Sequence, residues 1–541
     1  MRAILIPAFS ILAFASSQPR DLIGAGTLND LRWPDFSDFR ADLTACYEPA
    51  GPDLAWSRNA AITPQAIAAI EILRAAESEG LNPEDYDSSR WAARMVRPDL
   101  ARFDLALTVC MMRYASDLHD GRWNPGIYRS GLNVHGEHYE LAQLVRRMAD
   151  AADVRAVLAQ LEPPFPAYLR TRAALRLYLA LAREDDGAQL PPAKLLIEPG
   201  ASYPGIPRLA ALLRRLGDLP ADAPVPDRYR GSLVDAVKRF QLRHGIDGDG
   251  RIGKGTLAQL NTPLSHRVHQ LQLTLERFRW VPHEFARPPI VVNIPEFELR
   301  ALNASYETEL QMKIVVGEAY RRQTPVFAAE MKYVTFRPYW HVPVSITRGE
   351  LVPKVVRNRE YLAANAYEIV TANDRLVADA AINDEVLASL RSGKLALRQA
   401  PGPKNSLGLI AFLFPNEYSV YLHDTPATAL FSRSRRDFSH GCIRVEQPAL
   451  LAQWVLRDQP EWTLDQITEA MHGSKTLQVD LKTPIPVLIV YATSVVMGNG
   501  EIRFFDDLYG FDAQLDALSR KGYPCSRWTP TSGGRGPRPH E

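Results

Sequence analysis

The spacing of hydrophobic residues separates a helical first part of the chain from a later part with the pattern of strands. Between about residues 38 and 192, apolar residues recur every three or four positions, as on one face of an amphipathic helix. Loops containing proline and glycine separate the helical stretches. We therefore predict an all-α domain with helices at Ala66–Ala76, Ala101–Leu118, Leu141–Leu161 and Tyr168–Arg183.

A second and smaller helical unit is predicted after the boundary marked by Pro191-Pro192 and Pro199-Gly200. In its middle helix, Leu233, Val237 and Phe240 fall on one face, as core residues do. A further helix, from about Val268 to Arg279, connects this unit to the rest of the chain. The three helices of the unit are expected at Pro207–Leu216, Ser232–His244 and Lys254–Leu260.

After the connecting helix, the hydrophobic pattern changes to that of strands. Short β-branched or alternating runs are bounded by proline, glycine and asparagine. A more helical stretch interrupts them between about Lys332 and Lys404, so we predict a mainly β domain with an inserted, lid-like subdomain. The runs are Pro289–Ile294, Phe297–Leu302, Leu310–Val316, Ser419–Leu422 and Pro486–Tyr491, and the helices of the insertion are expected at Arg348–Ala364 and Ala381–Ser392.

These patterns predict a multidomain α+β protein, and a chain of 541 residues is long enough for several hydrophobic cores. The expected units are a signal peptide at 1–17, a helical domain at 18–198, a three-helix domain at 199–265, a connecting helix at 266–287, a mainly β domain at 288–520 with its insertion at about 332–404, and a disordered tail at 521–541. The tail is rich in proline, glycine and polar residues and has too little apolar surface to order it.

The start of the chain has the order of a secretory signal peptide. Met1-Arg2 precedes a short apolar run, and the small residues Ala15-Ser-Ser17 follow it. The apolar run is too short to span a bilayer, and no later segment has the roughly 18 uninterrupted apolar residues of a transmembrane helix. A buried N-terminal helix is the alternative interpretation. We therefore expect a protein that is soluble outside the cytoplasm, has no membrane span and is monomeric.

Charge and cysteine content exclude some classes of function. The 63 basic and 62 acidic residues give a net charge of +1, which provides no electrostatic drive toward nucleic acid. Four scattered cysteines, Cys46, Cys110, Cys442 and Cys525, are too few for a disulfide framework in a chain of this length. A cysteine that remains a thiol in an oxidising compartment is either buried, as expected for Cys110 in its apolar run, or kept for chemistry.

A candidate catalytic site lies around Cys442. In Ser419–Thr425, alternation places Tyr421 and His423 on one face of a strand, opposite the apolar Val420 and Leu422. Cys442 follows His440 and Gly441; the glycine allows close approach of the backbone, and amides there can form an oxyanion hole. A nearby imidazole favours the thiolate, which is the nucleophile. From these residues alone, the alternative is that Cys442 is a buried structural cysteine.

The longer motifs are more specific than these single residues. Tyr421-Leu-His-Asp-Thr-Pro426 and Phe438-Ser-His-Gly-Cys-Ile-Arg-Val445 resemble the paired signature of the L,D-transpeptidase catalytic domain, also called the YkuD domain. The resemblance continues through Arg337–Pro343 and Pro401–Gly408. Ala236–Gly253 resembles a peptidoglycan-binding domain, and Gly80–Tyr86 and Leu118–Arg122 resemble the helical scaffold of the large periplasmic members of this family.

The resemblance implies a periplasmic enzyme that links peptidoglycan stem peptides through their third-position diamino acids. Cys442 would form the thioester and release D-alanine, and the side chain of a second diamino acid would accept the acyl group. His423 would be the general base. Because some large members have serine where this chain has His440, that residue would support or shape the site. Peptidoglycan stem peptides and glycan are the implied partners, and carbapenems are expected to acylate Cys442.

The other site residues have roles that follow from their place in the motifs. Gly441 and Cys442 would supply amides for the oxyanion, and Ser439 belongs to the same loop and is a candidate for contact with substrate. Arg444 would bind a stem-peptide carboxylate or brace the loop. We expect a backbone carbonyl, rather than the carboxylate of Asp424, to orient His423. Tyr339 and Trp340 would line the cleft or pack in a core, and the run at Arg433–Arg436 would attract an anionic peptide or form a solvated loop.

Three alternatives remain at this point. A zinc hydrolase would use His341, His423, His440 and Cys442, although His440 and Cys442 are only two positions apart and no helical His-x-x-x-His pair is present. A noncatalytic peptidoglycan-binding protein would leave Cys442 inert. L,D-carboxypeptidation or attachment of a wall protein would use the same acyl-enzyme with another acceptor. The sequence predicts neither a metal nor any other cofactor.

Overall fold

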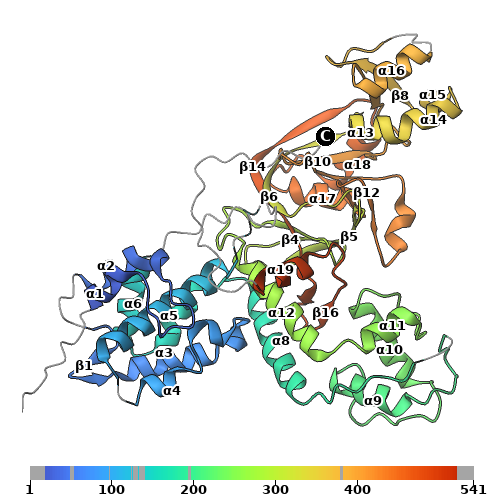
Figure 1. Ribbon diagram of the computed structural model, residues 1–541. Helices are drawn as coiled ribbons and strands as arrows, with labels where there is room; N and C mark the ends of the chain where they lie inside the picture. The colour runs from blue at the N-terminus through green and yellow to red at the C-terminus, as the bar shows by residue number, and fades with distance from the viewer. Residues whose placement is uncertain are drawn as a thin grey trace, which may run out of the picture.

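The computed structural model describes residues 19–48, 54–96, 98–123, 125, 132, 140–192, 196–377 and 382–520. They form a helical region, a three-helix unit and a mainly β domain with an insertion (Figure 1), so the predicted multidomain α+β fold is confirmed. Within the described part of the chain, no helix is long and apolar enough to cross a membrane. The expected signal peptide, Cys525 and the expected disordered tail lie outside the described residues.

A nine-stranded sheet forms the centre of the β domain, in the order β12-β5-β13-β11-β10-β6-β14-β3-β4, and β4 also pairs with β5, so the sheet closes on itself. Its interior is apolar because alternate residues of each strand, such as Leu299, Ile314 and Phe412, point inward. The strands are β3 Ile290–Asn293, β4 Glu298–Leu302, β5 Thr308–Gly317, β6 Phe327–Phe336, β10 Ile410–Leu413, β11 Leu422–His423, β12 Asp437–Ser439, β13 Ile443–Val445 and β14 Leu477–Val490; helices α17 Pro448–Val455 and α18 Leu464–His472 contribute to the same core.

The insertion between β6 and β10 has its own small core. Strand β6 pairs with β10 through Phe336, so the insertion leaves the sheet at about Arg337, later than the expected Lys332. The helix expected at Arg348–Ala364 is broken into short pieces, because Asn358 takes an extended conformation after α14. Its elements are β7 Trp340–His341, α13 Val344–Ile346, the π-helix η6 Thr347–Leu351, α14 Val352–Arg357, α15 Tyr361–Ala364, β8 Tyr367–Thr371, α16 Asp384–Ser392 and β9 Leu395–Gln399, and the strands pair in the order β7-β9-β8.

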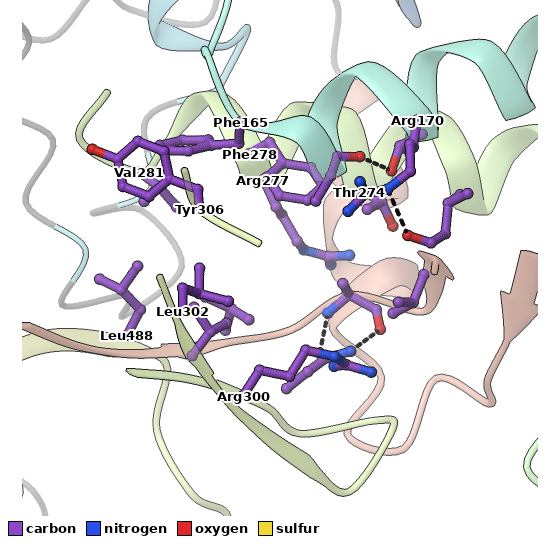
Figure 2. Close-up of a pocket in the computed structure, with 18 of the residues that line it drawn as sticks. Phe165, Arg170, Thr274, Arg277, Phe278, Val281, Arg300, Leu302, Tyr306 and Leu488 are labelled. Atoms are coloured by element: carbon purple, nitrogen blue, oxygen red, sulfur yellow. Dashed lines mark hydrogen bonds between the residues drawn. The ribbon is translucent and has the colours of Figure 1, made fainter. Parts of the chain in front are cut away.

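Two long helices connect the three regions. Helix α8 (Pro166–Arg183) lies beside α12 (Leu264–Arg279), and both pack against the outside of the sheet (Figure 1). Leu175 and Leu275 share an apolar cluster with Leu488 of β14. A cavity of about 160 Å³ remains between these helices and the strands. Figure 2 shows apolar and aromatic side chains that line this cavity, among them Phe165, Phe278, Val281, Leu302, Tyr306 and Leu488.

The predicted three-helix unit consists of α9 (Ile206–Arg215), α10 (Ser232–Arg243) and α11 (Lys254–Leu260). Leu233, Val237 and Phe240 lie in its core, as the sequence indicated. His244 stacks on Phe240 and on Phe504, and therefore joins this unit to the C-terminal part of the chain. That part contains the hairpin β15 Ser494–Val496 with β16 Ile502–Phe504, and helix α19 Phe511–Ser519.

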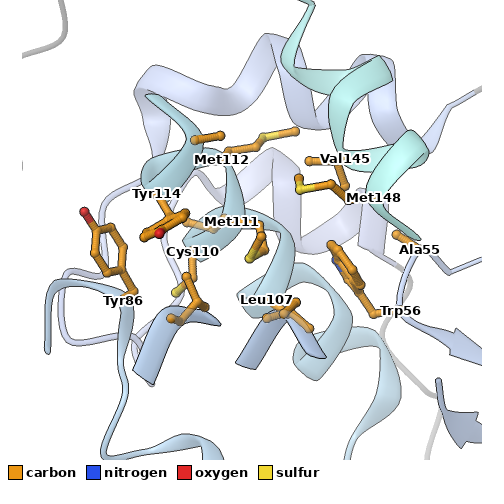
Figure 3. Close-up of a cluster of buried hydrophobic side chains, with 14 of the residues drawn as sticks. Ala55, Trp56, Tyr86, Leu107, Cys110, Met111, Met112, Tyr114, Val145 and Met148 are labelled. Carbon is orange, nitrogen blue, oxygen red and sulfur yellow. The ribbon is translucent and has the colours of Figure 1, made fainter. Parts of the chain in front are cut away.

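In the N-terminal region, helix α5 (Leu100–Asp120) is the central element. Figure 3 shows its Met111 and Met112 among side chains of neighbouring elements, including Trp56 and Met148. Cys110 is buried in the same core. The other elements are α1 Pro19–Ala25, η1 Ser37–Phe39, α2 Arg40–Tyr47, β1 Ser57–Arg58, β2 Ala61–Ile62, α3 Pro64–Arg74, η2 Ala76–Glu79, η3 Pro83–Tyr86, α4 Trp91–Arg94, α6 Leu141–Asp150, α7 Val154–Leu158 and η5 Ala159–Leu161.

The single helix expected at Leu141–Leu161 is divided into α6, α7 and η5. The reason is local: the side chain of Asp153 accepts a hydrogen bond from the amide of Arg155 (2.8 Å) and begins a new helix. Cys46 and Cys110 are both free and buried, and burial raises the pKa of the Cys46 thiol to about 11. These two cysteines are therefore packing residues.

An ion pair between Arg277 of α12 and Asp512 of α19 attaches the C-terminal helix to the rest of the protein, and its contribution to stability can be tested. The two side chains lie 2.5 Å apart and are largely buried. We expect Arg277→Met to destabilise the fold by about 3 kcal/mol, because it leaves the Asp512 carboxylate buried without its cation. Thermal unfolding of the intact protein measures this. Arg277→Met with Asp512→Leu should regain most of the loss; an unchanged midpoint in the single variant would contradict the assignment.

Candidate active site

Strands β11 and β13 bring the predicted site residues together. They run parallel, with Leu422 opposite Ile443 and His423 opposite Arg444. The amide of Ile443 donates to the carbonyl of Tyr421 (3.0 Å), which extends the register to the residue before β11. As a result, Cys442 lies beside Tyr421, and Arg444 lies beside His423.

His423 is held by the backbone, as expected. Its Nδ1 lies 2.5 Å from the carbonyl oxygen of Asp424, an arrangement that assigns the ring proton to Nδ1 and leaves Nε2 as a proton acceptor. The carboxylate of Asp424 instead accepts from the amides of Leu409 (2.8 Å) and Thr425 (2.7 Å). A Cβ at Gly408, which has a φ of +63°, would collide with this carboxylate. Asp424 therefore shapes the turn with its side chain and orients the imidazole with its carbonyl.

Burial keeps this imidazole neutral. His423 is only 4% exposed, although it faces away from the apolar interior. Burial lowers its pKa to about 3, the neighbouring charge of Arg444 acts in the same direction, and the bond to Asp424 opposes them. At neutral pH the ring can therefore accept a proton.

The thiol of Cys442 makes hydrogen bonds to two neighbours. Its Sγ lies 3.7 Å from the carbonyl oxygen of Ser419, to which the thiol donates, and the hydroxyl of Tyr421 also hydrogen-bonds the sulfur. Burial raises the pKa of the thiol, while the bonds with Tyr421 and the charge of Arg444 act against this shift. The resting pair is thus a thiol and a neutral imidazole.

The turn before β11 places the Ser419 carbonyl. Ser419 has a φ of 54°, which is uncommon for a residue with a side chain. Asn416 holds the turn: its side chain donates to Val420 O (2.7 Å) and accepts from the amide of Tyr418 (3.0 Å). Neither Ser419 nor Tyr421 was assigned a role from the sequence. The alternation that placed Tyr421 on the face of His423 was the available signal, whereas the left-handed turn at Ser419 had none.

The loop that carries Cys442 is fixed by its own side chains. Ser439 is buried; its hydroxyl donates to the carbonyl of Cys442 (2.6 Å) and accepts from the amide of Gly441 (3.1 Å). Gly441 has a φ of +119°, a conformation that glycine adopts readily. The hydroxyl of Ser439 is therefore engaged within the loop, and Cys442 supplies the next amide along it.

Arg444 is a cation close to both reacting groups. Among the residues that the structure describes, its buried Nε has no hydrogen-bond partner. Its charge acts on the pKa values of both His423 and Cys442. A buried guanidinium with an unused donor is a suitable partner for a carboxylate.

The insertion contacts this site at two points. The side chain of Trp340 hydrogen-bonds the hydroxyl of Tyr421. Glu350 accepts from Nε2 of His440 (2.7 Å) and pairs with Arg322 (2.5 Å). Tyr339 lies farther out and is 38% exposed, with the guanidinium of Arg398 over its ring at 4.5 Å.

The four residues considered as zinc ligands have separate partners. His341 lies 3.6 Å from Asp374, His423 bonds to the Asp424 carbonyl, and His440 bonds to Glu350. Throughout the described ranges, no group of three or more His, Cys, Asp or Glu side chains is arranged to hold a metal ion.

Two arginines of the basic run before Cys442, Arg435 and Arg436, have partners within the protein. Arg436 is buried and donates to the carbonyls of Ile314 (3.1 Å) and Phe297 (2.9 Å), and Arg435 pairs with Asp437 (2.7 Å). Arg436 therefore holds the loop onto neighbouring segments, whereas the pair of Arg435 with Asp437 lies within the loop and the strand that follows it. Neither alternative proposed from the sequence describes these two arginines fully.

Three segments of the chain match models of known protein families. Residues 287–487 match the family model "L,D-transpeptidase catalytic domain", residues 202–260 match "Putative peptidoglycan binding domain", and residues 41–175 match "Scaffold domain". A "Putative L,D-transpeptidase" from Haemophilus influenzae is 31% identical over 290 residues, which cover 53% of this chain and 58% of that protein. The match thus spans little more than half of the relative's length. A crystal structure of the L,D-transpeptidase from Xylanimonas cellulosilytica aligns with 56% of this chain and all of that one, at 15% identity and a TM-score of 0.17.

The raised pKa of Cys442 leads to a prediction about alkylation. Because burial raises the pKa of the Cys442 thiol, the labelling rate at neutral pH should be below that of a free cysteine, and its rise should come at a higher pH than about 8.5, where a free cysteine titrates. Peptide mass spectrometry after timed exposure to iodoacetamide measures the rate at Cys442, with Cys442→Ala as the control. Labelling that is already maximal at about pH 6 would instead indicate a thiolate–imidazolium pair.

Proposed function

Starting from the L,D-transpeptidase catalytic domain at 287–487, we propose that this protein is a peptidoglycan L,D-transpeptidase that works through a thioester on Cys442. The observation that carries the proposal is the register of β11 and β13, which brings the Cys442 thiol beside Tyr421 and, two residues farther along, the neutral imidazole of His423 beside Arg444. These are the parts that cysteine acyl transfer needs: a nucleophile, a base and donors for the oxyanion.

The acyl donor is a tetrapeptide stem, and the first half-reaction releases D-alanine. His423 Nε2 takes the thiol proton as sulfur attacks the carbonyl carbon at the L-centre of the third-position diamino acid. The amide of Cys442 and the Tyr421 hydroxyl would stabilise the oxyanion. When the tetrahedral intermediate collapses, the C–N bond breaks and the imidazolium returns the proton to the amine of D-alanine. The thioester remains on Cys442.

In the second half-reaction an amine replaces the thioester. The side-chain amine of another stem's diamino acid loses a proton to His423 and attacks the thioester carbonyl. The C–S bond breaks, the thiol regains its proton, and a link between two third-position residues forms. Water in place of the amine would give L,D-carboxypeptidation, and a wall protein's amine would give attachment, so product analysis distinguishes these outcomes.

Substrate recognition involves the groups around the thiol. We propose that Arg444 binds a stem-peptide carboxylate, because its buried Nε has an unused donor. Trp340, through Tyr421, and Tyr339 at the rim would line the cleft beneath the insertion. The insertion would admit the amine acceptor while limiting water.

The other two domains fit attachment to the cell wall. The unit matched as a peptidoglycan-binding domain would hold the enzyme on glycan and stem peptides. We place the enzyme in the periplasm, where the wall is assembled, because residues 1–17 have the pattern of a signal peptide. A monomer without a cofactor is sufficient for this chemistry.

Cys442→Ala tests the proposed function. We expect it to abolish formation of linked muropeptides, because no other described residue in the site is placed as the nucleophile, while binding to isolated sacculi stays near the wild-type level. Mass analysis of muropeptides incubated with each protein gives the answer. Sacculus binding by the wild type without any change of the muropeptides would favour the noncatalytic alternative.

Substitutions of the two histidines separate the base from its neighbour. His423→Ala removes the proton acceptor and should slow acylation about 100- to 10,000-fold. His440→Ser removes the bond to Glu350 but leaves the proposed proton acceptor in place, and should slow it less. Single-turnover release of D-alanine measures both, and a larger effect of His440→Ser would reverse the two roles.

A further inference from the structure

The carbonyl of Gly441 is anchored by a residue from a different loop. The hydroxyl of Thr324 donates a hydrogen bond to this carbonyl oxygen at 2.8 Å. The Gly441 carbonyl and the Cys442 amide belong to one planar trans peptide, in which C=O and N–H point in opposite directions. A bond that fixes the carbonyl therefore also fixes the direction in which the Cys442 N–H points.

Thr324 is itself held firmly. It is 0% exposed, and its Oγ1 accepts from the amide of Gly317 at 2.9 Å, so its proton is committed to Gly441. The hydroxyl of Tyr509 accepts from the amide of Thr324 (3.3 Å) and donates to the carbonyl of Gly317 (2.6 Å). All three residues thus form one buried hydrogen-bonded group behind the nucleophile loop.

Gly317, at the end of β5, makes this arrangement possible. A Cβ at this position would lie 1.9 Å from the carbonyl oxygen of Arg322 and 2.8 Å from the amide of Thr324. Both neighbours are backbone atoms and cannot move aside cheaply. The loop after β5 therefore folds back across the strand end only because residue 317 is glycine.

Tyr509 lies outside the residues matched to the catalytic domain, 287–487. Its amide donates to the hydroxyl of Tyr491 (2.8 Å), which donates to Asp507 (2.6 Å). The same C-terminal part is tied to α12, where Gln270 donates to the carbonyl of Phe505 (2.9 Å). The nucleophile loop is thus connected through Thr324 and Tyr509 to the helix that joins the domains.

From this geometry we infer that Thr324 is a positioning residue that aims the backbone N–H of Cys442 at the oxyanion, and that Tyr509 holds Thr324 in place. The neighbouring amide of Gly441 is already engaged by Ser439, so the direction of the Cys442 amide matters most. The inference rests on the proposed acyl-enzyme and adds the residues that prepare its oxyanion site.

Two reactions of the same thiol separate positioning from general damage. With p-nitrophenyl acetate, sulfur attacks a carbonyl, an acetyl thioester forms and p-nitrophenol leaves, so an oxyanion develops. With iodoacetamide, sulfur attacks a saturated carbon, a thioether forms and iodide leaves, so no oxyanion develops. A misaimed amide should slow only the first reaction.

We expect Thr324→Val to slow acetylation of Cys442 about 10- to 100-fold, up to the loss seen when one oxyanion donor is removed. Its rate of alkylation and the pH profile of that rate should stay within about twofold of the wild type. Thr324→Ser retains the hydroxyl and should restore acetylation. Tyr509→Phe should give an intermediate, acetylation-only loss, and serves as the second variant if Thr324→Val does not fold.

The inference would be overturned if Thr324→Val slowed both reactions equally, or if neither Thr324→Val nor Tyr509→Phe slowed acetylation. It would also be overturned if the ester did not acetylate the wild type. Failure of the proposed function gives a different result: the wild type would form the acetyl thioester but leave muropeptides unchanged. In that case the contrast between Thr324→Val and Thr324→Ser would still decide the role of Thr324.

Discussion

The parallel pairing of β11 with β13 is the constraint on which the site depends. It places Tyr421 beside Cys442 and His423 beside Arg444. A shift of one residue would turn each side chain to the opposite face of the sheet. Two short strands cannot fix such a register alone. The surrounding closed sheet does so, because β10 and β5 pair with them from either side and share one apolar core.

Burial then sets the chemistry of these groups. Burial lowers the pKa of the His423 imidazole and raises the pKa of the Cys442 thiol. Both shifts favour the uncharged forms, so the resting site carries no thiolate–imidazolium pair. The thiol donates to the Ser419 carbonyl, and Tyr421 stands beside it as a donor. In the proposed reaction, proton transfer to His423 therefore accompanies attack by the thiol.

The sequence predicted the parts that local patterns encode. Helical periodicity located α5, α8 and α10, and the motifs around His423 and Cys442 named residues that the structure brings together. A local helix cap and a sheet set by long-range packing were missed. Asp153 starts a new helix within the segment expected as one, and the three-stranded sheet of the insertion has short strands without clear alternation. Ser419 acts through a backbone carbonyl, so its side-chain type contained no signal.

Arg322 lies where the insertion and the loop after β5 meet near Cys442. Its backbone belongs to the loop that carries Thr324, while its guanidinium pairs with Glu350 of the insertion. Burial opposes ionisation of Glu350, but hydrogen bonds from His440 and Arg322 outweigh it and lower the pKa of the carboxyl. The insertion is thus held by a charged carboxylate on one side and by Trp340 on the other. Because both contacts end on residues close to Cys442, a movement of the insertion would also change the surroundings of the thiol.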